Sequence, residues 1–380
     1  MKAIPSARLR KLRTWKQGEG PAEFKSGENF QQSDVLLDLA SNDYLGLTRH
    51  PNLREAACSI MERDGVGAGA SRFVTGSRLI HKDLEEDLAL WLGQESVLLF
   101  PSGFQANIAA VVALADRHTT VFADRLIHHS LLMGVKASGA KLKRFAHNDL
   151  DDLEIHLKLF RKQTVHQVPL VLTESLFSME GTSPSLQGMA LLCEKYGAKL
   201  LVDEAHSLGI LGSQGRGLCY GISDQITMVS GTFGKAFGSG GAFLATNKDM
   251  KEHLLQTSGA FRYTTALAPP LAAAAMAALQ LIKANPDWGF ELQNRADNWR
   301  SGLVDEGWDR PPGNGPILSV VIGTDEQALT MQKQLEMSGL LSVAIRPPTV
   351  PEDTARLRLV LRRDLPNGTL RRLLLALKTQ

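Results

Sequence analysis

The sequence has 380 residues, enough for two domains, and its 42 Lys and Arg residues nearly balance 40 Asp and Glu residues, giving a formal net charge of +2. A charge this small gives no overall attraction to nucleic acid or to an acidic membrane, and no apolar stretch is long enough to cross a bilayer. Three cysteines, far apart and without CxxC spacing, argue against a disulfide framework and a structural zinc site, and we expect reduced, buried thiols.

The first 45 residues are predicted to form an arm that leads into a large domain. Their start is basic, with Arg8, Arg10, Lys11 and Arg13, but it lacks the apolar core of a signal peptide. We therefore interpret it as a solvated helix face and expect a cytoplasmic protein.

Residues 46–285 are predicted to form the large domain, in which helices and strands alternate. A helix is expected over residues 81–93, because Leu84, Leu88 and Trp91 follow helical spacing and Gly93 marks the end. Short apolar runs predict buried strands at residues 96–100, 120–123, 169–173, 199–202, 226–229 and 241–245. Such runs, separated by helical stretches, are typical of a mainly parallel sheet with helices on both faces.

Residues 286–380 are predicted to form a smaller α+β domain. The break at Asn285-Pro286-Asp287 follows an Ala-rich helix. Beyond it we expect helices over residues 290–305 and 325–338, strands at 317–322, 342–345 and 356–361, and a last helix. The fewer alternations and the hairpin-like spacing distinguish this part from the α/β pattern before it.

The motif Asp-Glu-Ala-His, residues 203–206, ends a predicted strand. Open α/β sheets bind ligands at the carboxyl ends of their strands, so Asp203 and His206 can approach one planar ligand from two directions. A solvated strand end is the simpler interpretation. The same four residues occur in nucleic-acid helicases, but those need a GxxxxGK[ST] phosphate loop upstream, which this sequence lacks.

A lysine stands in a Gly- and Thr-rich loop after another predicted strand, in the motif Ser-Gly-Thr-Phe-Gly-Lys, residues 230–235. The glycines let backbone approach a phosphate, and Thr232 adds a hydroxyl. By itself Lys235 could be a solvated loop lysine or part of a plain anion site. Together with Asp203 upstream, it forms the pair that pyridoxal phosphate (PLP) requires: a Schiff-base lysine and a carboxylate for the pyridinium nitrogen.

Three further motifs carry weaker signals. Ser102-Gly103-Phe104 lies between a predicted strand and a helix, where free backbone amides bind anions. The pair His128-His129 would suggest a metal, but no third ligand has suitable spacing, so we expect no metal site. The stretch Gly65–Gly69 lacks the GxGxxG spacing of a dinucleotide site.

Taken together, these blocks resemble the α-oxoamine synthases, which are PLP-dependent transferases of fold type I. The resemblance runs from Ser-Asn-Asp-Tyr-Leu-Gly, residues 41–46, through blocks at 100–104, 177–181, 203–206 and 230–238, to Ala-Arg-Leu-Arg-Leu, residues 355–359. It implies an α/β fold with a mainly parallel large domain and a small C-terminal α+β domain. It also implies a homodimer, in which Tyr263-Thr264-Thr265 would reach the neighbour's phosphate.

The resemblance implies a role for each site residue. Lys235 would hold the cofactor, Asp203 would pair with its ring nitrogen, and His206 would donate to its phenolic oxygen. His128 would stack on the ring. The other implied cofactor contacts lie at the phosphate or elsewhere on the cofactor: Gly103, Phe104, Thr232 and Ser178.

The implied substrates are an amino acid and an acyl thioester. Arg358 matches the arginine that binds the amino-acid carboxylate. The motif Arg346-Pro347-Pro348-Thr349 is similar to the corresponding motif in the branch of the family that makes 8-amino-7-oxononanoate for biotin. This resemblance implies L-alanine and pimeloyl-coenzyme A, or the pimeloyl thioester of a carrier protein, as substrates. Thr349 would then contact substrate, and Arg13 aligns with the family's acyl-chain arginine.

Two alternatives stay open at the level of sequence. One is a sister synthase that uses another pair of substrates, such as glycine C-acetyltransferase. The other is a non-enzymatic nucleotide-binding module built on Asp-Glu-Ala-His.

Overall fold

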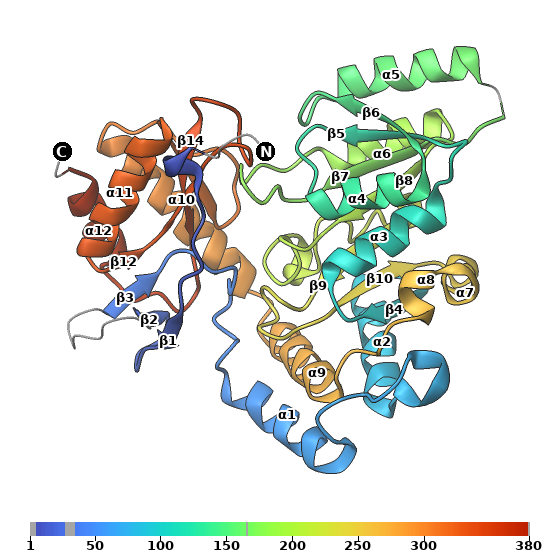
Figure 1. Cartoon of the computed structure of the whole chain (residues 1–380), viewed down its shortest axis with the longest axis horizontal. Helices are drawn as coiled ribbons and strands as arrows, with labels where there is room; N and C mark the ends of the chain where they lie inside the picture. Colours follow the sequence, from blue (N-terminus) through green and yellow to red (C-terminus); the bar gives the residue numbers. More distant parts are fainter. Residues whose placement is uncertain (1–4, 27–34, 165, 379–380) are drawn as a thin grey trace. The chain divides into compact units, whose positions relative to one another are not determined.

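The computed structural model describes residues 5–26, 35–164 and 166–378, which cluster into two units (Figure 1). The first unit takes in residues up to Gly46, Ser178–Thr182 and Phe290 onward, and the second takes in Leu47–Phe177 and Ser183–Gly289. The N-terminal segment therefore groups with the C-terminal residues, and five residues from the middle of the sequence join them.

A seven-stranded sheet forms the centre of the second unit, in the order β4-β10-β9-β8-β7-β5-β6. The strands are β4 (Ser96–Phe100), β5 (Thr120–Asp124), β6 (Lys141–Phe145), β7 (Leu170–Glu174), β8 (Lys199–Asp203), β9 (Met228–Thr232) and β10 (Ala242–Thr246). Neighbours from β9 to β6 run parallel, whereas β10 runs antiparallel to both β9 and β4. The sheet confirms the predicted mainly parallel α/β class.

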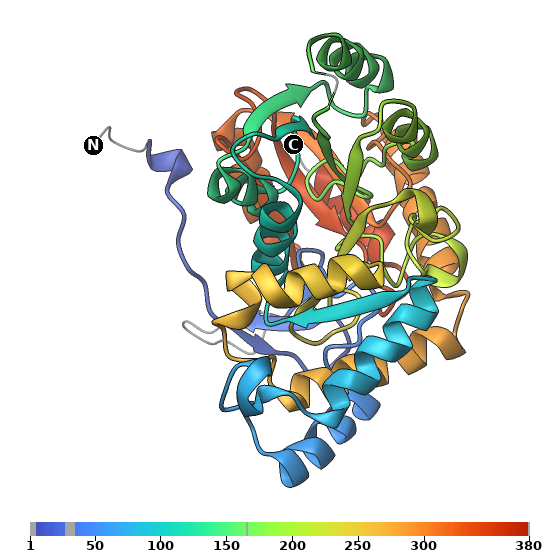
Figure 2. The ribbon, with the colours of Figure 1, turned by 90° about the vertical axis from the view of Figure 1, so that its right-hand side faces the viewer.

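Helices cover both faces of this sheet, which explains the continuous apolar runs of its central strands (Figures 1 and 2). On one side α3 (Gly103–Leu114) packs with α4 (His129–Ser138), and elsewhere α5 (Leu150–Gln163) packs with α6 (Leu186–Lys195). Leu98, Leu172, Leu201 and Leu244 form one buried core with residues of α3 and α4.

The remaining helices of this unit lie near the β4 edge or connect strands. They are α1 (Pro51–Asp64), α2 (Leu79–Leu92), α7 (Lys248–Thr257), α8 (Gly259–Arg262) and α9 (Pro269–Ala284). The Ala-rich helix α9 packs against α1 and α2, where its small side chains allow close approach. Over the residues that the structure describes, no helix is both long and apolar enough to cross a membrane.

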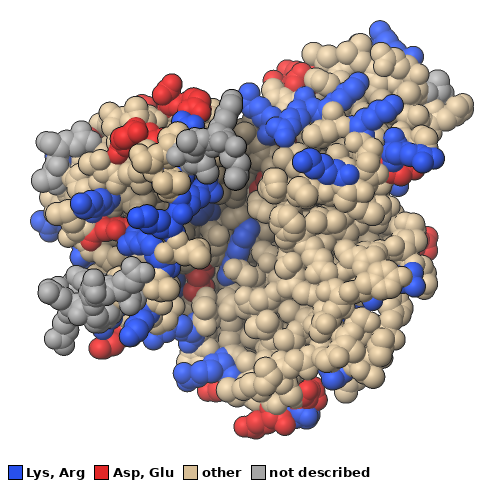
Figure 3. Space-filling model, viewed as in Figure 1, with Lys and Arg blue, Asp and Glu red and all other residues tan. Residues whose placement is uncertain are grey.

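Strand β6 was not predicted, because its sequence Lys-Leu-Lys-Arg-Phe is polar. It is the outer strand of the sheet, it pairs only with β5 in that sheet, and its first four residues are exposed. Figure 3 shows Lys and Arg side chains gathered over this part of the unit. Charged side chains on an edge strand discourage pairing with other chains.

The first unit contains two smaller sheets. One has the order β1-β2-β3-β12, with β1 (Trp15–Gln17), β2 (Glu23–Ser26), β3 (Val35–Asp38) and β12 (Leu340–Leu341). The other has the order β11-β14-β13, with β11 (Ile317–Gly323), β14 (Ala355–Val360) and β13 (Val343–Ile345). The helices are α10 (Trp288–Asp305), α11 (Asp325–Met337) and α12 (Thr369–Lys378).

Two details of the described chain differ from expectation. The N-terminal segment supplies strands, and β3 pairs in parallel with β12, which ties it to the C-terminal residues. The three cysteines are free thiols, but only Cys193 and Cys219 are buried, whereas Cys58 on α1 is exposed. The expectation of buried thiols was therefore wrong for Cys58.

Candidate functional site

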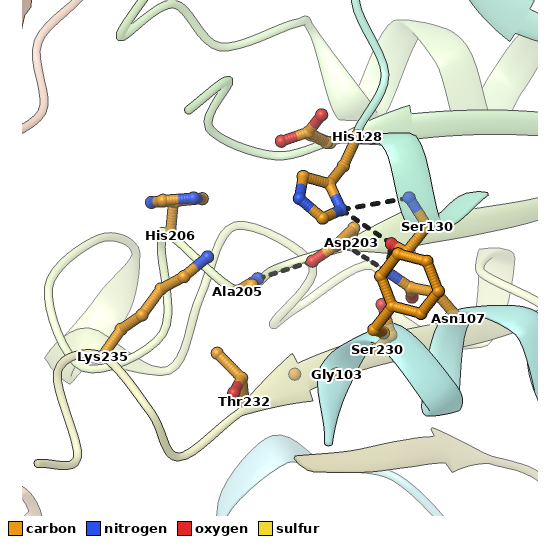
Figure 4. A pocket seen from close by; sticks show the side chains of 13 residues that line it. Gly103, Asn107, His128, Ser130, Asp203, Ala205, His206, Ser230, Thr232 and Lys235 are labelled. Atoms are coloured by element: carbon orange, nitrogen blue, oxygen red, sulfur yellow. Dashed lines mark hydrogen bonds between the residues drawn. The ribbon is translucent and has the colours of Figure 1, made fainter. Parts of the chain in front are cut away.

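A cavity of about 220 Å³ lies at the carboxyl ends of the central strands of the second unit (Figure 4). It is lined by residues at or just beyond the ends of β7, β8 and β9 and by residues from the starts of α3 and α4. All the predicted site residues of this unit line it: Gly103, Phe104, His128, Asp203, His206, Thr232 and Lys235.

The register of the sheet places the strand ends side by side. Asp203, the last residue of β8, lies opposite Glu174 on β7 and Ser230 on β9. All three line the cavity. Parallel strands that end together thus present a row of polar side chains at the carboxyl ends of buried, mostly apolar strands.

The carboxylate of Asp203 is buried and held by two donors. The backbone amide of Ala205 donates to Oδ1 at 2.9 Å, and Nδ2 of Asn107 donates to Oδ2 at 2.7 Å. A carboxylate fixed in this way can stabilise a positive charge on a planar ring in the cavity. Asn107 lies on α3, and nothing in the sequence pattern identified it.

His128 caps the N-terminus of α4. Its Nδ1 accepts a hydrogen bond from the backbone amide of Ser130 at 3.3 Å and lies 2.7 Å from Oγ of Ser130. Desolvation in the cavity lowers the pKa of the His128 imidazole, and the charge of Lys235 acts in the same direction, although Asp203 opposes it. A neutral ring is suited to stacking against a flat, electron-poor ligand.

Lys235 extends into the cavity, and its amino end lies on the side of His206 and Asp203 (Figure 4). Its loop is closed by backbone hydrogen bonds from Gly238 to Lys235, at 2.9 Å, and from Ser239 to Phe233, also at 2.9 Å. Gly238 has a φ of 61° and lies against the backbone of Leu47 and Thr48, where a side chain would clash. The loop therefore holds the lysine in a defined place.

The other end of the cavity is suited to an anion. Gly103 and Phe104 begin α3, where the first amides of a helix have no intrahelical partner. Thr232 lies beside them, since a Cβ added at Gly103 would lie 3.7 Å from Cβ of Thr232. The hydroxyl of Thr232 donates to the carbonyl of Gly241 at 3.0 Å, so the helix amides are the more available donors.

These groups fit pyridoxal phosphate. The cavity offers a primary amine for its aldehyde, a buried carboxylate for its ring nitrogen and a helix N-terminus for its phosphate. The three groups come from three separate segments of the chain.

Arg358, in the first unit, is a buried cation surrounded by neutral acceptors. Its Nε donates to the carbonyl of Ser178 at 2.6 Å and one terminal nitrogen donates to Oδ1 of Asn42 at 2.9 Å, and the hydroxyl of Tyr44 also contacts it. It is only 6% exposed, yet among the described residues no carboxylate lies within ion-pair distance of it. Its neighbour on the same strand face, Arg356, has Glu180 at 3.4 Å.

The other predicted substrate residues have different partners. Arg13 donates to Glu336 at 2.6 Å and lies 4.4 Å from the centre of the Trp15 ring. Thr349 is exposed and accepts a hydrogen bond from Arg10 at 2.6 Å. Within this unit the structure thus brings Ser178 and Arg358 together, whereas Arg13 and Thr349 do not contact them.

Comparison with known proteins identifies the family. The aminotransferase class I and II family matches residues 34–377. The 8-amino-7-oxononanoate synthase of Gluconacetobacter diazotrophicus is 42% identical over 350 residues, which cover 90% of this chain and 87% of that protein. The enzyme of the same name from Alkalilimnicola ehrlichii is 41% identical over 331 residues, covering 86% and 83%. The chain belongs to the 8-amino-7-oxononanoate synthase family.

Solved structures agree with this assignment. Serine palmitoyltransferase from Sphingomonas wittichii has a TM-score of 0.90 at 27% identity, covering 97% of this chain and 91% of that one. The 8-amino-7-oxononanoate synthase from Francisella tularensis has a TM-score of 0.76 at 28% identity, covering 90% and 96%. Family and fold confirm the predicted α-oxoamine synthase resemblance, fold type I, the PLP cofactor and the class of PLP-dependent acyltransferase. The nucleotide-binding alternative has no support.

Proposed function

We propose that the protein transfers the pimeloyl group of a thioester, carried by coenzyme A or by an acyl carrier protein, to the Cα of L-alanine. The free thiol of the carrier and carbon dioxide are released, and 8-amino-7-oxononanoate is formed. The observation that carries this proposal is the cavity that unites Lys235 with Asp203, in a chain about 40% identical to named 8-amino-7-oxononanoate synthases. The product is a biotin precursor, which places the enzyme in biotin synthesis.

Bound PLP supplies an aldehyde that captures amines and a ring that withdraws electrons from the carbon next to the amine. Lys235 would bind the aldehyde carbon until the amino group of alanine displaces it, and the freed neutral amine would then remove the proton from Cα. Asp203 would keep a proton on the ring nitrogen, because a fixed carboxylate favours the charged ring. These tasks require the two side chains to approach one ligand from different sides, as the cavity allows (Figure 4).

The remaining cavity residues would hold the cofactor in place. His128 would cover one face of the ring and His206 would donate to the phenolic oxygen. The amides of Gly103 and Phe104 would bind the phosphate, with Thr232 beside them. Ser178 is proposed as a further cofactor contact from the family resemblance.

Arg358 is the proposed receptor for the carboxylate of alanine. A buried guanidinium that has only neutral acceptors lacks the counter-ion that would compensate the loss of its hydration. A substrate carboxylate would supply that charge in a bidentate arrangement. Asn42, Tyr44 and the carbonyl of Ser178 would hold the guanidinium in place before substrate arrives.

The acyl side of the site would involve Thr349 and an arginine from the N-terminal segment. Arg13 is the residue that aligns with the family's acyl-chain arginine. The structure offers Arg10 as an alternative, because Arg10 contacts Thr349 whereas Arg13 contacts Glu336.

The active form is proposed to be a homodimer in the cytoplasm. Phe73, Val74 and Tyr263 are 53%, 73% and 82% exposed, and Phe73 packs edge-on against Phe261, two residues before Tyr263. Exposed apolar side chains that gather in this way mark a protein–protein interface. A second copy would cover them, and Thr264 and Thr265 would then lie at the edge of the neighbour's site.

A panel of substrates tests the proposed reaction. Purified, PLP-loaded protein is assayed with alanine, glycine and serine, each against acetyl-, pimeloyl- and palmitoyl-coenzyme A and pimeloyl carrier protein. We expect alanine with a pimeloyl thioester to give the highest kcat/KM. The panel includes serine and palmitoyl thioester because serine palmitoyltransferase structures match the fold. A higher kcat/KM for another pair would assign the protein to a sister synthase.

A further inference from the structure

The side-chain amide of Asn107 bridges two residues of the cofactor site (Figure 4). It is 3% exposed, and its Nδ2 donates to Oδ2 of Asp203 at 2.7 Å and to Oγ of Ser130 at 2.8 Å. An amide nitrogen carries two hydrogens, one for each of these acceptors.

The orientation of this amide is determined by its neighbours. If the amide were turned over, its oxygen would face the carboxylate of Asp203, and two acceptors would lie in contact in a buried place. The observed orientation leaves Oδ1 of Asn107 without a hydrogen-bond partner among the described residues. That cost is smaller than the cost of opposing an oxygen to a buried charge.

The direction of the hydrogen bonds continues from Ser130 to His128. Nδ1 of His128 accepts the backbone amide hydrogen of Ser130, so this nitrogen carries no hydrogen itself. In the 2.7 Å contact between the same nitrogen and Oγ of Ser130, the hydroxyl must therefore be the donor. Oγ is then an acceptor toward Asn107, and the hydrogen of the neutral imidazole lies on Nε2.

We propose that Asn107 is a positioning residue whose two amide hydrogens fix the carboxylate of Asp203 and, through Ser130, the neutral Nε2–H tautomer of His128. The proposal rests on the proposed function, because both target residues are there placed against the cofactor. With Ala205 on one oxygen and Asn107 on the other, the plane of the Asp203 carboxylate is fixed, and it would be held ready for the ring nitrogen of bound PLP. With Nδ1 accepting both hydrogens, the imidazole stays uncharged, as would suit it beside the positively charged ring of bound PLP.

The first test needs no substitution. Protein labelled with ¹⁵N-histidine is studied by NMR at pH 7.5, without cofactor and with PLP, and the His128 signals are assigned by comparison with His128→Gln. We expect ring-nitrogen shifts of the Nε2–H tautomer in both samples. Shifts of the Nδ1–H tautomer, or of a protonated ring, would overturn the proposal.

The second test separates the hydrogen bond from Asn107 to Asp203 from the link through Ser130 to His128. Asn107→Leu removes both amide hydrogens at similar volume. Ser130→Ala removes the hydroxyl that lies 2.7 Å from Nδ1 of His128 and leaves the backbone amide of residue 130, whose 3.3 Å contact is too long to hold one tautomer by itself. We expect Asn107→Leu to weaken PLP binding by the cofactor-free protein on the order of tenfold, because a hydrogen bond to a charged group is lost, and to mix the tautomers of His128. We expect Ser130→Ala to mix the tautomers but to weaken PLP binding less than Asn107→Leu does. PLP binding is followed by quenching of tryptophan fluorescence.

Asn285→Ala is the control, because within the described part of the chain the side-chain amide of Asn285 donates to the carbonyl of Leu281 on α9 and to no other group. It should leave PLP affinity and the His128 signals unchanged. Unaltered PLP affinity in Asn107→Leu, or an unaltered tautomer in Ser130→Ala, would contradict the proposal. If a variant does not fold, the tautomer of His128 in the unmodified protein still tests the proposal.

The outcomes also separate this proposal from the proposed function. Tight PLP binding with a different substrate pair would overturn the proposed reaction and leave the role of Asn107 intact. If the protein did not bind PLP, the proposed reaction would fail, and the tautomer of His128 in the cofactor-free protein would still test the hydrogen-bond chain.

Discussion

Three buried arginines near the C-terminus differ in what surrounds them. Arg362 contacts three carboxylates, those of Asp38, Asp43 and Asp364, and Arg356 contacts Glu180. Arg358 contacts only neutral groups among the described residues. All three are buried to a similar degree, and Arg358 is the one of the three that has no carboxylate beside it, which favours a ligand carboxylate at that position.

Replacement of Arg358 by lysine should therefore affect alanine more than the thioester. Lysine keeps the charge but loses the planar pair of donors, and we expect kcat/KM for alanine to fall on the order of tenfold to a hundredfold. Steady-state kinetics in which each substrate is varied separately would measure this. Arg356→Lys on the same strand face is the control, because Glu180 already neutralises that residue. Equal effects of both variants on both substrates would show a structural role only.

The sequence revealed some site residues and not others, for a physical reason. Asp203, His206 and Lys235 follow apolar strands, and polar residues at such places stand out. Asn107 lies within the apolar helix α3, and it reaches Asp203 and Ser130 only because α3 packs with α4 over the sheet. No spacing within one element could show that contact.

At the level of elements, the buried side chain of Glu204, just after β8, binds the backbone of the loop at Leu218 and Cys219. Oε1 of Glu204 accepts hydrogen bonds from the backbone amides of Leu218 at 2.6 Å and Cys219 at 3.2 Å, and from the Ser207 hydroxyl at 3.1 Å. Gly217 has a φ of 86° and lies so close to this carboxylate that a side chain there would clash. Burial raises the pKa of Glu204 to about 7.

This raised pKa predicts a pH dependence of stability. Between pH 4.5, the ordinary value, and about 7, folded Glu204 keeps a proton that the unfolded chain releases, so the free energy of unfolding falls as pH rises. Above pH 7 the free energy of unfolding is lower by about 3 kcal/mol than at pH values below 4.5.

Glu204→Gln should flatten this dependence, because the amide does not titrate. Urea unfolding of the cofactor-free protein at pH 5, 6, 7 and 8 would show a smaller decrease than in the unmodified protein. The exposed Glu252 provides the control, since Glu252→Gln should keep the original slope. An unchanged slope in Glu204→Gln would mean that this carboxyl does not hold its proton in the folded state.

The elements that the sequence predicted well are those whose burial pattern is uniform. Strand β4 was predicted at its observed bounds, and β5, β7, β8 and β10 within one residue at either end. Strand β9 begins two residues later than expected and ends in Ser-Gly-Thr, because ladder pairing with β10 extends it beyond its apolar residues. The short strands β1 to β3 have no repeating apolar pattern, and only pairing with one another and with β12 defines them.

We expect the activity of the protein to depend on association with a second copy of the chain. A charged residue within the exposed apolar group of Phe73, Val74 and Tyr263 would have to be buried without a partner on association, which is costly. We expect Val74→Glu to weaken the dimer at least tenfold and to lower activity per chain at the same protein concentrations. Light scattering and activity assays over a dilution series would measure both.

Leu159→Glu is the matched control for this prediction. Leu159 on α5 is 51% exposed but lies outside the proposed interface, so its variant should associate and react normally. Full activity of a monomeric Val74→Glu protein would contradict the proposal that the dimer is the active form. The sequence alone could not locate this interface, because Phe73 and Val74 follow a glycine-rich stretch without helical or strand periodicity.

The row formed by Glu174, Asp203 and Ser230 has a consequence for how this family can vary. Side chains alternate between the two faces of a strand, so a change of length by one residue within β8 would turn Asp203 away from the cavity. An insertion would put the apolar Val202 in its place, and a deletion would put Glu204 there. Apolar substitutions in β8 change only packing, whereas a change of length would remove the proposed partner of the ring nitrogen at once. Homologous genes should therefore tolerate many exchanges of Leu200 and Leu201, but insertions and deletions should be confined to the surface loops between the strands.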